Sequence, residues 1–456
     1  DIPPYDTPET AARSLESAVN CAAAGDVICV ASSPEPYAVS ASGLEKRGVS
    51  YEGSADRSVK LEISGAKAIT LASESDRTVT FSGFTVVNGG GAACALDVDS
   101  SASSDVLAVS NCLFTGIANA VQFNTPSDNE VLIADCEFVN VTNTFSSSGG
   151  IVLVAQPTSL RMVRTSFRDC SFSFSTEVRV PEGSALAPVV IGATGSAVTA
   201  VDCSFRGITV TGAYLSSTVI SAERPVRNVI STFDRCSFLD CSGRHGFCRL
   251  ASDVTQDYGN TLTLRNCLLE SMRSAVPTTP GSATAQFFFF ANGLTLENCT
   301  LVDCRAAGNV VLPGSNIGSV NLRNTIIKDM LNVEGTAAIP LCVAAYRPAA
   351  SAIEKTLVST AKPADEQTPA TWYPDGNGNY TDAERGVVGK LVFKATEPNP
   401  LALAHESFGR GLGDASIWGP ADVDLVGNLR LSKKGTVDLG CYEYLKLKLG
   451  LIISVH

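Results

Sequence analysis

Carboxylates are the residues of this sequence that could cleave a sugar chain. Hydrolysis of a glycosidic bond needs two facing carboxyl groups, and a lyase needs a basic residue beside an acidic calcium site. Four aspartates recur at equivalent places of a repeated motif, namely Asp169, Asp240, Asp303 and Asp329. Other copies of the motif carry glycine, asparagine or serine at the same place, so we interpret this position as a backbone bend.

Histidine adds little to the catalytic inventory. His245 lies in the phrase Gly243-Arg244-His245-Gly246, which comes nearest to the Gly-His-Gly turn of polygalacturonase-like hydrolases. An arginine interrupts that turn, and the chain contains no Asp-Asp dipeptide. We interpret His245 as a loop residue. No convergent set of catalytic residues is recognised, which argues against an enzyme without excluding one.

One segment has the alternating oxygen ligands of a calcium loop. Asp375, Asn377 and Asn379 alternate with glycine, and Asp382 follows. The distal glutamate that binds calcium through both oxygens is missing. A Gly/Asn turn without metal is the simpler interpretation, and calcium is the single cofactor that the sequence suggests.

Two features stand at the C-terminal end. Asp424, Arg430, Asp438 and Glu443 could form an acid/base cluster, but an ion pair that ties the last coils together is the simpler expectation.

The final residues alternate leucine with lysine and then become apolar; the apolar members are Leu445, Leu447, Leu449, Leu451, Ile452 and Ile453. As a strand they could dock on their own solenoid or augment an open sheet edge of a second copy. Such head-to-tail addition would build a filament.

A repeated motif must position these residues. Each copy has a small residue, a large apolar residue two positions later, a bend residue, and then another apolar residue. Cysteine fills the small position at Cys112, Cys136, Cys203, Cys236, Cys267 and Cys299. The period of two indicates a strand, and unequal repeats with like stacked on like predict an all-β parallel β-helix. In the weakest copy, Phe84 is aligned with Phe114 and Val86 with the bend.

The stacked cysteines allow two interpretations. Neighbouring copies would place them about 4.8 Å apart, within reach of a disulfide. The same position also accepts Thr165 and Thr325, which favours a row of small buried thiols. Disulfides of a secreted protein are the alternative.

The chain is expected to be one continuous domain in three parts. Residues 1–30 contain an amphipathic helix, capped at Thr7 or Thr10, and a first strand. The helix would cover the open end of the solenoid. Residues 31–342 form the β-helix coils, and residues 343–456 are irregular, loop-rich coils with a closing strand.

Both ends of the chain resemble known β-helix proteins. SLESAV (residues 14–19) and GDVICV (residues 25–30) resemble the start of pectate-lyase-like right-handed β-helix proteins. DLVGNLR (residues 424–430) and VDLGCYEY (residues 437–444) resemble the closing signature of bacterial choice-of-anchor Q β-helix proteins. The resemblance implies a right-handed coil and a secreted or cell-surface bacterial protein, and it implies no particular activity.

Composition excludes some functions and leaves three open. The chain of 456 residues has a net charge of −12, so we expect no nucleic-acid partner, and no apolar run is long enough for a membrane span. We favour an extracellular structural, surface or adhesive β-helix that assembles with itself. The alternatives are a polysaccharide lyase or glycoside hydrolase with a groove near residues 171–202, and a glycan-binding protein that uses Trp372, Tyr373 and Tyr380.

Overall fold

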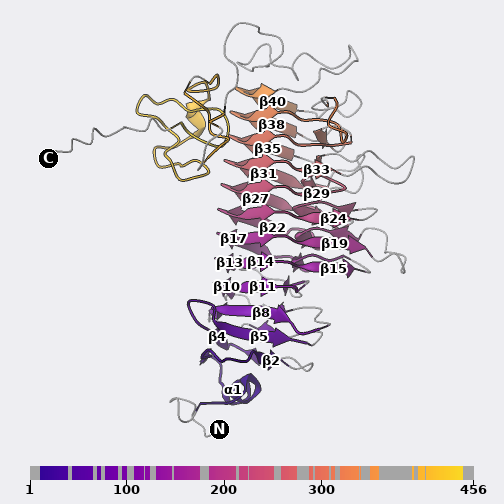
Figure 1. Ribbon diagram of the computed structural model, residues 1–456, viewed down its shortest axis with the longest axis vertical. Helices are drawn as coiled ribbons and strands as arrows, with labels where there is room; N and C mark the ends of the chain where they lie inside the picture. The colour runs from indigo at the N-terminus through magenta and orange to yellow at the C-terminus, as the bar shows by residue number, and fades with distance from the viewer. Residues whose placement is uncertain are drawn as a thin grey trace, which may run out of the picture.

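The computed structural model is an elongated parallel β-helix, with the helix α1 (Leu15–Cys21) at one end and the strand β40 (Ala350–Glu354) at the other (Figure 1). The predicted all-β parallel β-helix with an N-terminal helix is confirmed. The structure describes residues 11–39, 44–64, 69–72, 78–90, 95–99, 107–117, 119–123, 130–145, 148–174, 184–211, 215–223, 225–250, 258–274, 287–290, 293–307, 310–313, 319–337, 339, 350–358, 393–394, 399–405 and 407–444.

Two parallel sheets of twelve described strands each run the length of the coil. Sheet A consists of β1 (Val27–Cys29), β4 (Ser50–Glu52), β7 (Val79–Ser82), β10 (Leu107–Ser110), β13 (Glu130–Ala134), β17 (Ser159–Val163), β22 (Ala197–Val201), β27 (Ile230–Asp234), β31 (Thr261–Arg265), β35 (Gly293–Glu297), β38 (Ser319–Arg323) and β40. Sheet B consists of β2 (Tyr37–Val39), β5 (Val59–Ile63), β8 (Phe84–Asn88), β11 (Leu113–Thr115), β14 (Glu137–Val139), β18 (Ser166–Arg168), β23 (Ser204–Arg206), β28 (Ser237–Leu239), β32 (Leu268–Glu270), β36 (Thr300–Val302), β39 (Ile326–Lys328) and β41 (Leu357–Val358).

Shorter sheets complete the coil. Sheet C consists of β3 (Leu44–Arg47), β6 (Ile69–Ala72), β9 (Leu96–Asp99), β12 (Val121–Phe123), β16 (Val152–Val154), β21 (Val189–Ile191), β26 (Ile220–Ala222), β30 (Cys248–Arg249), β34 (Phe288–Phe290) and β37 (Val311–Pro313). Sheet D consists of β15 (Thr142–Phe145), β19 (Ser171–Phe174), β24 (Thr209–Thr211), β29 (Ser242–Gly243) and β33 (Arg273–Ser274), and β20 (Ala185–Leu186) pairs with β25 (Leu215–Ser216).

The helix α1 starts later than the sequence suggested. Its N-cap is Ser14, whose hydroxyl accepts a hydrogen bond from Ser17 N–H at 3.1 Å; the expected caps Thr7 and Thr10 lie outside the described residues. Leu15 and Val19 are buried against the end of the core, as amphipathic spacing predicts. The structure describes no helix that could span a lipid bilayer.

Left-handed residues turn the chain between strands. The predicted bend position has positive φ throughout the later turns, for example 54° at Asn140 and 56° at Asp169, and asparagine, aspartate and glycine tolerate this conformation best. A second left-handed position, which we did not predict, precedes the cysteine position. Arginine occupies it in two turns, at Arg164 and Arg235, with φ of 46° and 51°. Arg164 donates to both oxygens of Asp135 in the turn before at 2.6 and 2.7 Å.

The core is filled by stacked rings. Phe114, Phe138, Phe167 and Phe205 are buried and stack in successive turns, with ring centroids 5.0, 4.9 and 4.5 Å apart. Each stacked pair contributes roughly 0.5–1.5 kcal/mol beyond its buried area. Identical residues at one position therefore keep the turns in register.

The register of the first copy corrects our alignment. Phe114 pairs with Val86, and Ser110 pairs with Ser82. This places Phe84 at the cysteine position, so the alignment of Phe84 with Phe114, and of Val86 with the bend, is wrong by two residues. Phe84 is buried and stacks on Phe81 with ring centroids 4.5 Å apart. A slip of two residues keeps every apolar side chain inside, so alternation alone could not exclude it.

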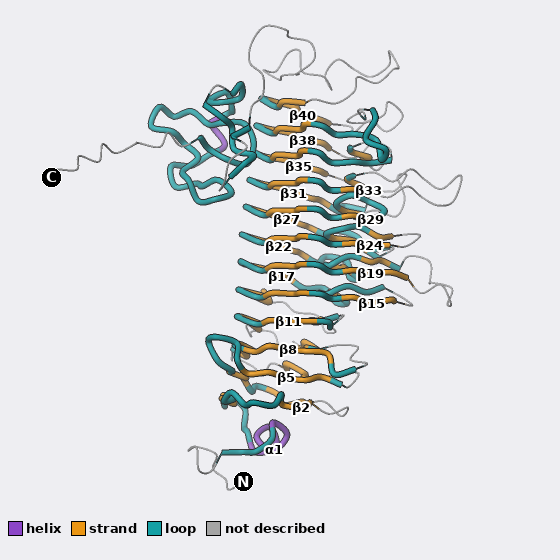
Figure 2. The backbone as a smooth tube through the Cα atoms, viewed as in Figure 1, coloured by secondary structure: helices purple, strands orange, loops and turns teal. Residues whose placement is uncertain are grey.

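A lobe without sheets packs on the last turns. We call residues 393–394, 399–405 and 407–444 the C-terminal lobe. It is built of loops and one 3-10 turn, η3 (Ala415–Ile417), as expected for irregular C-terminal coils (Figure 2). Its position against the side of the coil decides where the closing residues lie.

Candidate functional site

The closing residues form a buried network around Arg430. The Arg430 side chain is fully buried; its Nη1 donates to Glu443 Oε1 at 2.9 Å and its Nε donates to Asn266 Oδ1 at 2.7 Å. The two oxygens of Glu443 accept the N–H of Asp438 at 3.2 and 3.1 Å. Asp424 accepts the N–H of Glu443 at 2.9 Å. The structure thus brings the four predicted closing residues together.

Asparagines of the solenoid hold the C-terminal lobe in place. Asn298 Oδ1 accepts from Trp418 Nε1 at 2.8 Å, and its Nδ2 donates to the carbonyl of Asp438 at 2.9 Å. Asn324 Oδ1 accepts the N–H of Asp414 at 2.6 Å. Asn298 and Asn324 hold φ of 49° and 55° at the second left-handed position. The same amides therefore turn the coil and bind the lobe.

Burial raises the pKa values of two acids in this network. Burial raises the pKa of Glu443 to about 8, although Arg430 acts in the opposite direction, and burial also raises the pKa of Asp438. A carboxyl group with such a pKa could exchange protons near neutral pH. Glu443 is only 8% exposed, however, and its oxygens are engaged by Arg430 and a backbone N–H. The network is suited to docking the lobe and presents no acid to a substrate.

An apolar seam under the lobe was missed at the sequence level. The outward position of sheet B holds, in successive turns, Ser166, Ser204, Ser237, Leu268, Thr300, Ile326 and Leu357. Leu268 packs with Tyr442, and Ile326 packs with Leu439. The change from serine to leucine along one position was visible in the repeats. It marks the turns that the lobe covers.

The cysteine position is a hydrogen-bonding position. Cys236 Sγ donates to Ala200 O in the preceding turn at 3.5 Å and to Asp234 O in its own turn at 3.3 Å. Thr165 Oγ1 makes equivalent bonds at 3.3 and 3.1 Å. The six predicted ladder cysteines are buried free thiols, and burial raises the pKa of Cys236 well above its usual range. A high pKa leaves little thiolate, so the ladder is structural.

Aspartate recurs at the bend position because the backbone there is left-handed. Asp240 and Asp303 have φ of 54° and 48°. Between them lies Glu270, whose pKa is raised by burial and further by the two aspartates. We did not single out Glu270 because its environment depends on three different turns. Among the described residues, no group of three or more histidine, cysteine or acidic side chains could hold a metal.

The remaining predicted residues divide into two groups. His245 is 3% exposed and its Nε2 lies 3.2 Å from Arg249 Nη1, so it packs inside the coil. Several predictions fall outside the described residues: Asp375, Asn377, Asn379, Asp382, Trp372, Tyr373, Tyr380, Leu445, Leu447, Leu449, Leu451, Ile452 and Ile453.

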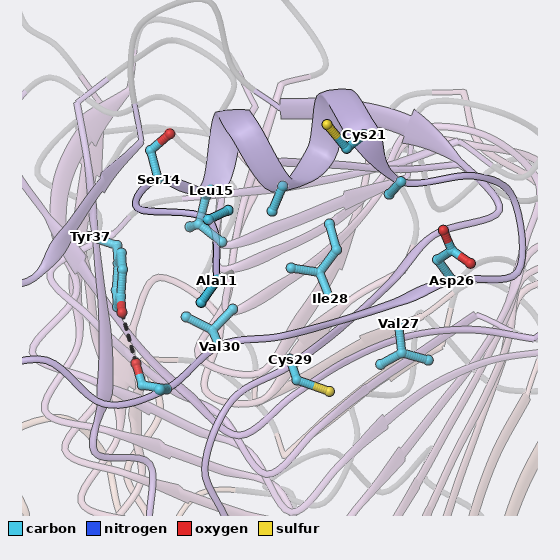
Figure 3. Close-up of a pocket in the computed structure, with 14 residues that line it drawn as sticks. Ala11, Ser14, Leu15, Cys21, Asp26, Val27, Ile28, Cys29, Val30 and Tyr37 are labelled. Carbon is cyan, nitrogen blue, oxygen red and sulfur yellow. Dashed lines mark hydrogen bonds between the residues drawn. The ribbon is translucent and has the colours of Figure 1, made fainter. Parts of the chain in front are cut away.

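A groove opens at the N-terminal end of the coil. It has a volume of about 1020 Å³ and lies between α1 and residues 26–31 (Figure 3). Ile28 and Val30 point across it toward the helix, whereas Val27 and Cys29 point away. Val27 is 52% exposed. The helix covers the end of the core through Leu15 and leaves the edge of β1 accessible among the described residues.

Comparison with known proteins assigns no family. No family model matches the chain, and no curated protein matches it. The likeness to pectate-lyase-like and choice-of-anchor Q proteins stays a resemblance of the residues quoted above. The function has to be argued from the molecule itself.

Proposed function

We propose that this protein is an extracellular structural β-helix that assembles end to end by strand addition. The open edge of β1, with the groove beside it, is the observation that carries the proposal. The resemblance to secreted β-helix proteins supports the extracellular location. A solenoid with two unlike ends suits a head-to-tail polymer, because such contacts do not close.

The backbone of β1 offers hydrogen-bonding groups to a new strand. β4 is the one described strand that pairs with β1, and on that side Val30 N–H donates to Glu52 O at 2.7 Å. Successive residues of a parallel strand address opposite neighbours. The N–H and C=O groups of Val27 and Cys29 therefore face the side of β1 on which the structure describes no strand. Such an edge is a template for another strand.

The groove fits the side chains of an added strand. Its apolar lining includes Leu15, Ile28 and Val30, and Asp26 stands at one end (Figure 3). Alternate apolar side chains of an incoming strand would enter it, and backbone pairing would supply affinity. The groove volume of about 1020 Å³ is larger than one side chain can fill.

Residues 445–456 of a second copy are the occupant that we propose. Leu445, Leu447 and Leu449 alternate with Lys446 and Lys448, so one face is apolar and the other is positive. With the leucines in the groove, the lysines would lie on the opposite face of the added strand. In the sequence this segment follows the C-terminal lobe, and that lobe packs on the turns at the other end of the coil from β1 (Figure 1).

The chain's own N-terminal residues are a poorer occupant. Residues 1–10 include Pro3, Pro4 and Pro8. Proline has no N–H and fits poorly into a paired strand. The C-terminal segment has no proline.

Deletion of residues 445–456 tests the proposal. Analytical ultracentrifugation and negative-stain microscopy of the full chain should show end-to-end polymers, and the deletion should give monomers. Val27→Pro should act likewise, because it removes an N–H from the open edge and leaves the bonds to β4 intact. Val27→Thr keeps that N–H and is the matched control. Monomers of the unmodified chain at every concentration, or polymers in both the deletion and Val27→Pro, would contradict strand addition.

A further inference from the structure

Three nitrogen-bearing side chains of the C-terminal lobe gather around the ring of Tyr444. Arg410 Cζ lies 3.8 Å from the ring centroid and Lys394 Nζ lies 5.2 Å from it. The ring of His405 stacks on Tyr444 with centroids 5.6 Å apart. Attraction to the ring offsets the repulsion between the two cations. We call Lys394, His405 and Arg410 the cationic cluster.

The cationic cluster presents donors and few acceptors. Arg410 Nη1 lies 2.9 Å from His405 Nδ1. A guanidinium can only donate, so Nδ1 accepts and the imidazole proton is on Nε2. His405 is exposed, while Lys394 and Arg410 are half-buried. Arg410 Nε is buried and has no hydrogen-bond partner among the described residues. The half-buried Lys394 ammonium and the exposed His405 ring can serve an external acceptor.

Within the described part of the chain, no acid forms an ion pair with the cationic cluster. No ion pair among the described residues includes Lys394, His405 or Arg410. The charge of Arg410 acts to lower the pKa of Asp438, against the larger effect of burial, which raises it. Its carboxylate oxygens already accept the N–H of Gly411 at 2.7 Å and of Tyr444 at 2.8 Å. Lys394 and Arg410 thus form no ion pair within the described part of a chain of net charge −12.

We propose that the cationic cluster binds the carboxylate or sulfate group of an acidic polysaccharide. Lysine and arginine bind oxyanions through charge-assisted hydrogen bonds, and His405 Nε2–H adds a neutral donor. One compact cluster suits one oxyanion at a time, as a polymer with one acid per sugar supplies. A nucleic acid needs many cations along its backbone, which this acidic surface does not offer. The site is independent of end-to-end assembly and would attach the solenoid to an acidic glycan.

Calorimetric titration at low salt tests this site. The probes are an oligogalacturonate, heparin, neutral dextran and inorganic sulfate, and the protein is the full chain carrying Val27→Pro, so that assembly does not add avidity. The two acidic polymers should bind and dextran should not. Lys394→Ala should weaken binding about tenfold, as expected for loss of a charge-assisted contact.

Matched variants separate the site from general charge. Lys433→Ala removes one charge from an exposed loop of the same lobe and should leave binding unchanged. Tyr444→Phe keeps the ring and should bind, whereas Tyr444→Leu should not. Equal losses in Lys394→Ala and Lys433→Ala, or no binding of either acidic polymer, would overturn the proposal. Inorganic sulfate bound as tightly as the polymers would overturn the assignment to a polysaccharide.

Discussion

Glu443→Gln is expected to remove most of the pH dependence of lobe docking. Burial raises the pKa of Glu443 from 4.5 to about 8. A carboxyl group whose pKa is higher in the folded state stabilises that state most fully below its unfolded pKa, here below pH 4.5. This contribution is lost as the pH rises through about 8. Glutamine resembles the protonated acid in shape and does not titrate.

The expected magnitude follows from the same shift. A rise from 4.5 to about 8 corresponds to about 5 kcal/mol of docking free energy lost between these two pH values. Burial also raises the pKa of Asp438, so Asp438 adds to the loss in the same direction. Glu443→Gln should therefore reduce the pH dependence of the docking free energy without abolishing it. The double variant Glu443→Gln with Asp438→Asn should reduce it further.

Trp418 reports on docking. Its indole is 6% exposed and donates to Asn298, and the chain has two tryptophans, so Trp372→Phe leaves Trp418 as the single probe. Urea titrations of its fluorescence from about pH 5 to pH 9 measure the docking free energy. Glu354→Gln, which removes the carboxylate of the ion pair with Arg323, is the control. An unchanged slope in Glu443→Gln would show that Glu443 stays ionised beside Arg430 throughout, and would refute the reasoning.

Three further predictions concern the coil and the seam. Cys236→Val should lower the free energy of unfolding in urea by about 1 kcal/mol more than Cys236→Thr, because threonine keeps the two hydrogen bonds. Equal losses would mean that side-chain size alone determines the residue at this position. Leu268→Ser should weaken lobe docking by about 2 kcal/mol, measured by Trp418 fluorescence, while the far-UV circular dichroism of the coil stays unchanged; a parallel loss of both signals would contradict a local seam. In a host that glycosylates asparagine, the exposed Asn140 should carry a glycan and the buried Asn298 should not. Glycopeptide mass spectrometry checks both residues, and a glycan at Asn298 would mean that the lobe is not docked.

The coil could be predicted because its causes are local. Alternation from Cys112 to Phe114 sets which side chains face inward, and residues such as Asn140 and Asp169 supply the left-handed bends. Repetition multiplies a weak signal, since every copy needs the same residue types at the same places. The first copy was misaligned because Phe84 satisfies the apolar pattern at either of two registers.

The candidate site depended on contacts that the sequence does not display. The residue types of Arg430 and Glu443 predicted an ion pair, but Asn266, the other partner of Arg430, lies 164 positions away. Likewise, the cationic cluster joins Lys394 to Tyr444 across the lobe. Residue spacing carries no information about pairs that loops of unequal length bring together.

The strands, the bends and the inward row of the β-helix can be derived from the amino-acid sequence, because they follow from backbone conformation and from the burial of alternate side chains. Which turns the lobe covers, which edge stays open at β1 and which acids become buried depend on how distant segments pack. Desolvation, strand pairing and charge clustering arise only when distant segments exclude water from one another. The pKa of Glu443 is the clearest case, since the same residue in an exposed coil would titrate as an ordinary acid.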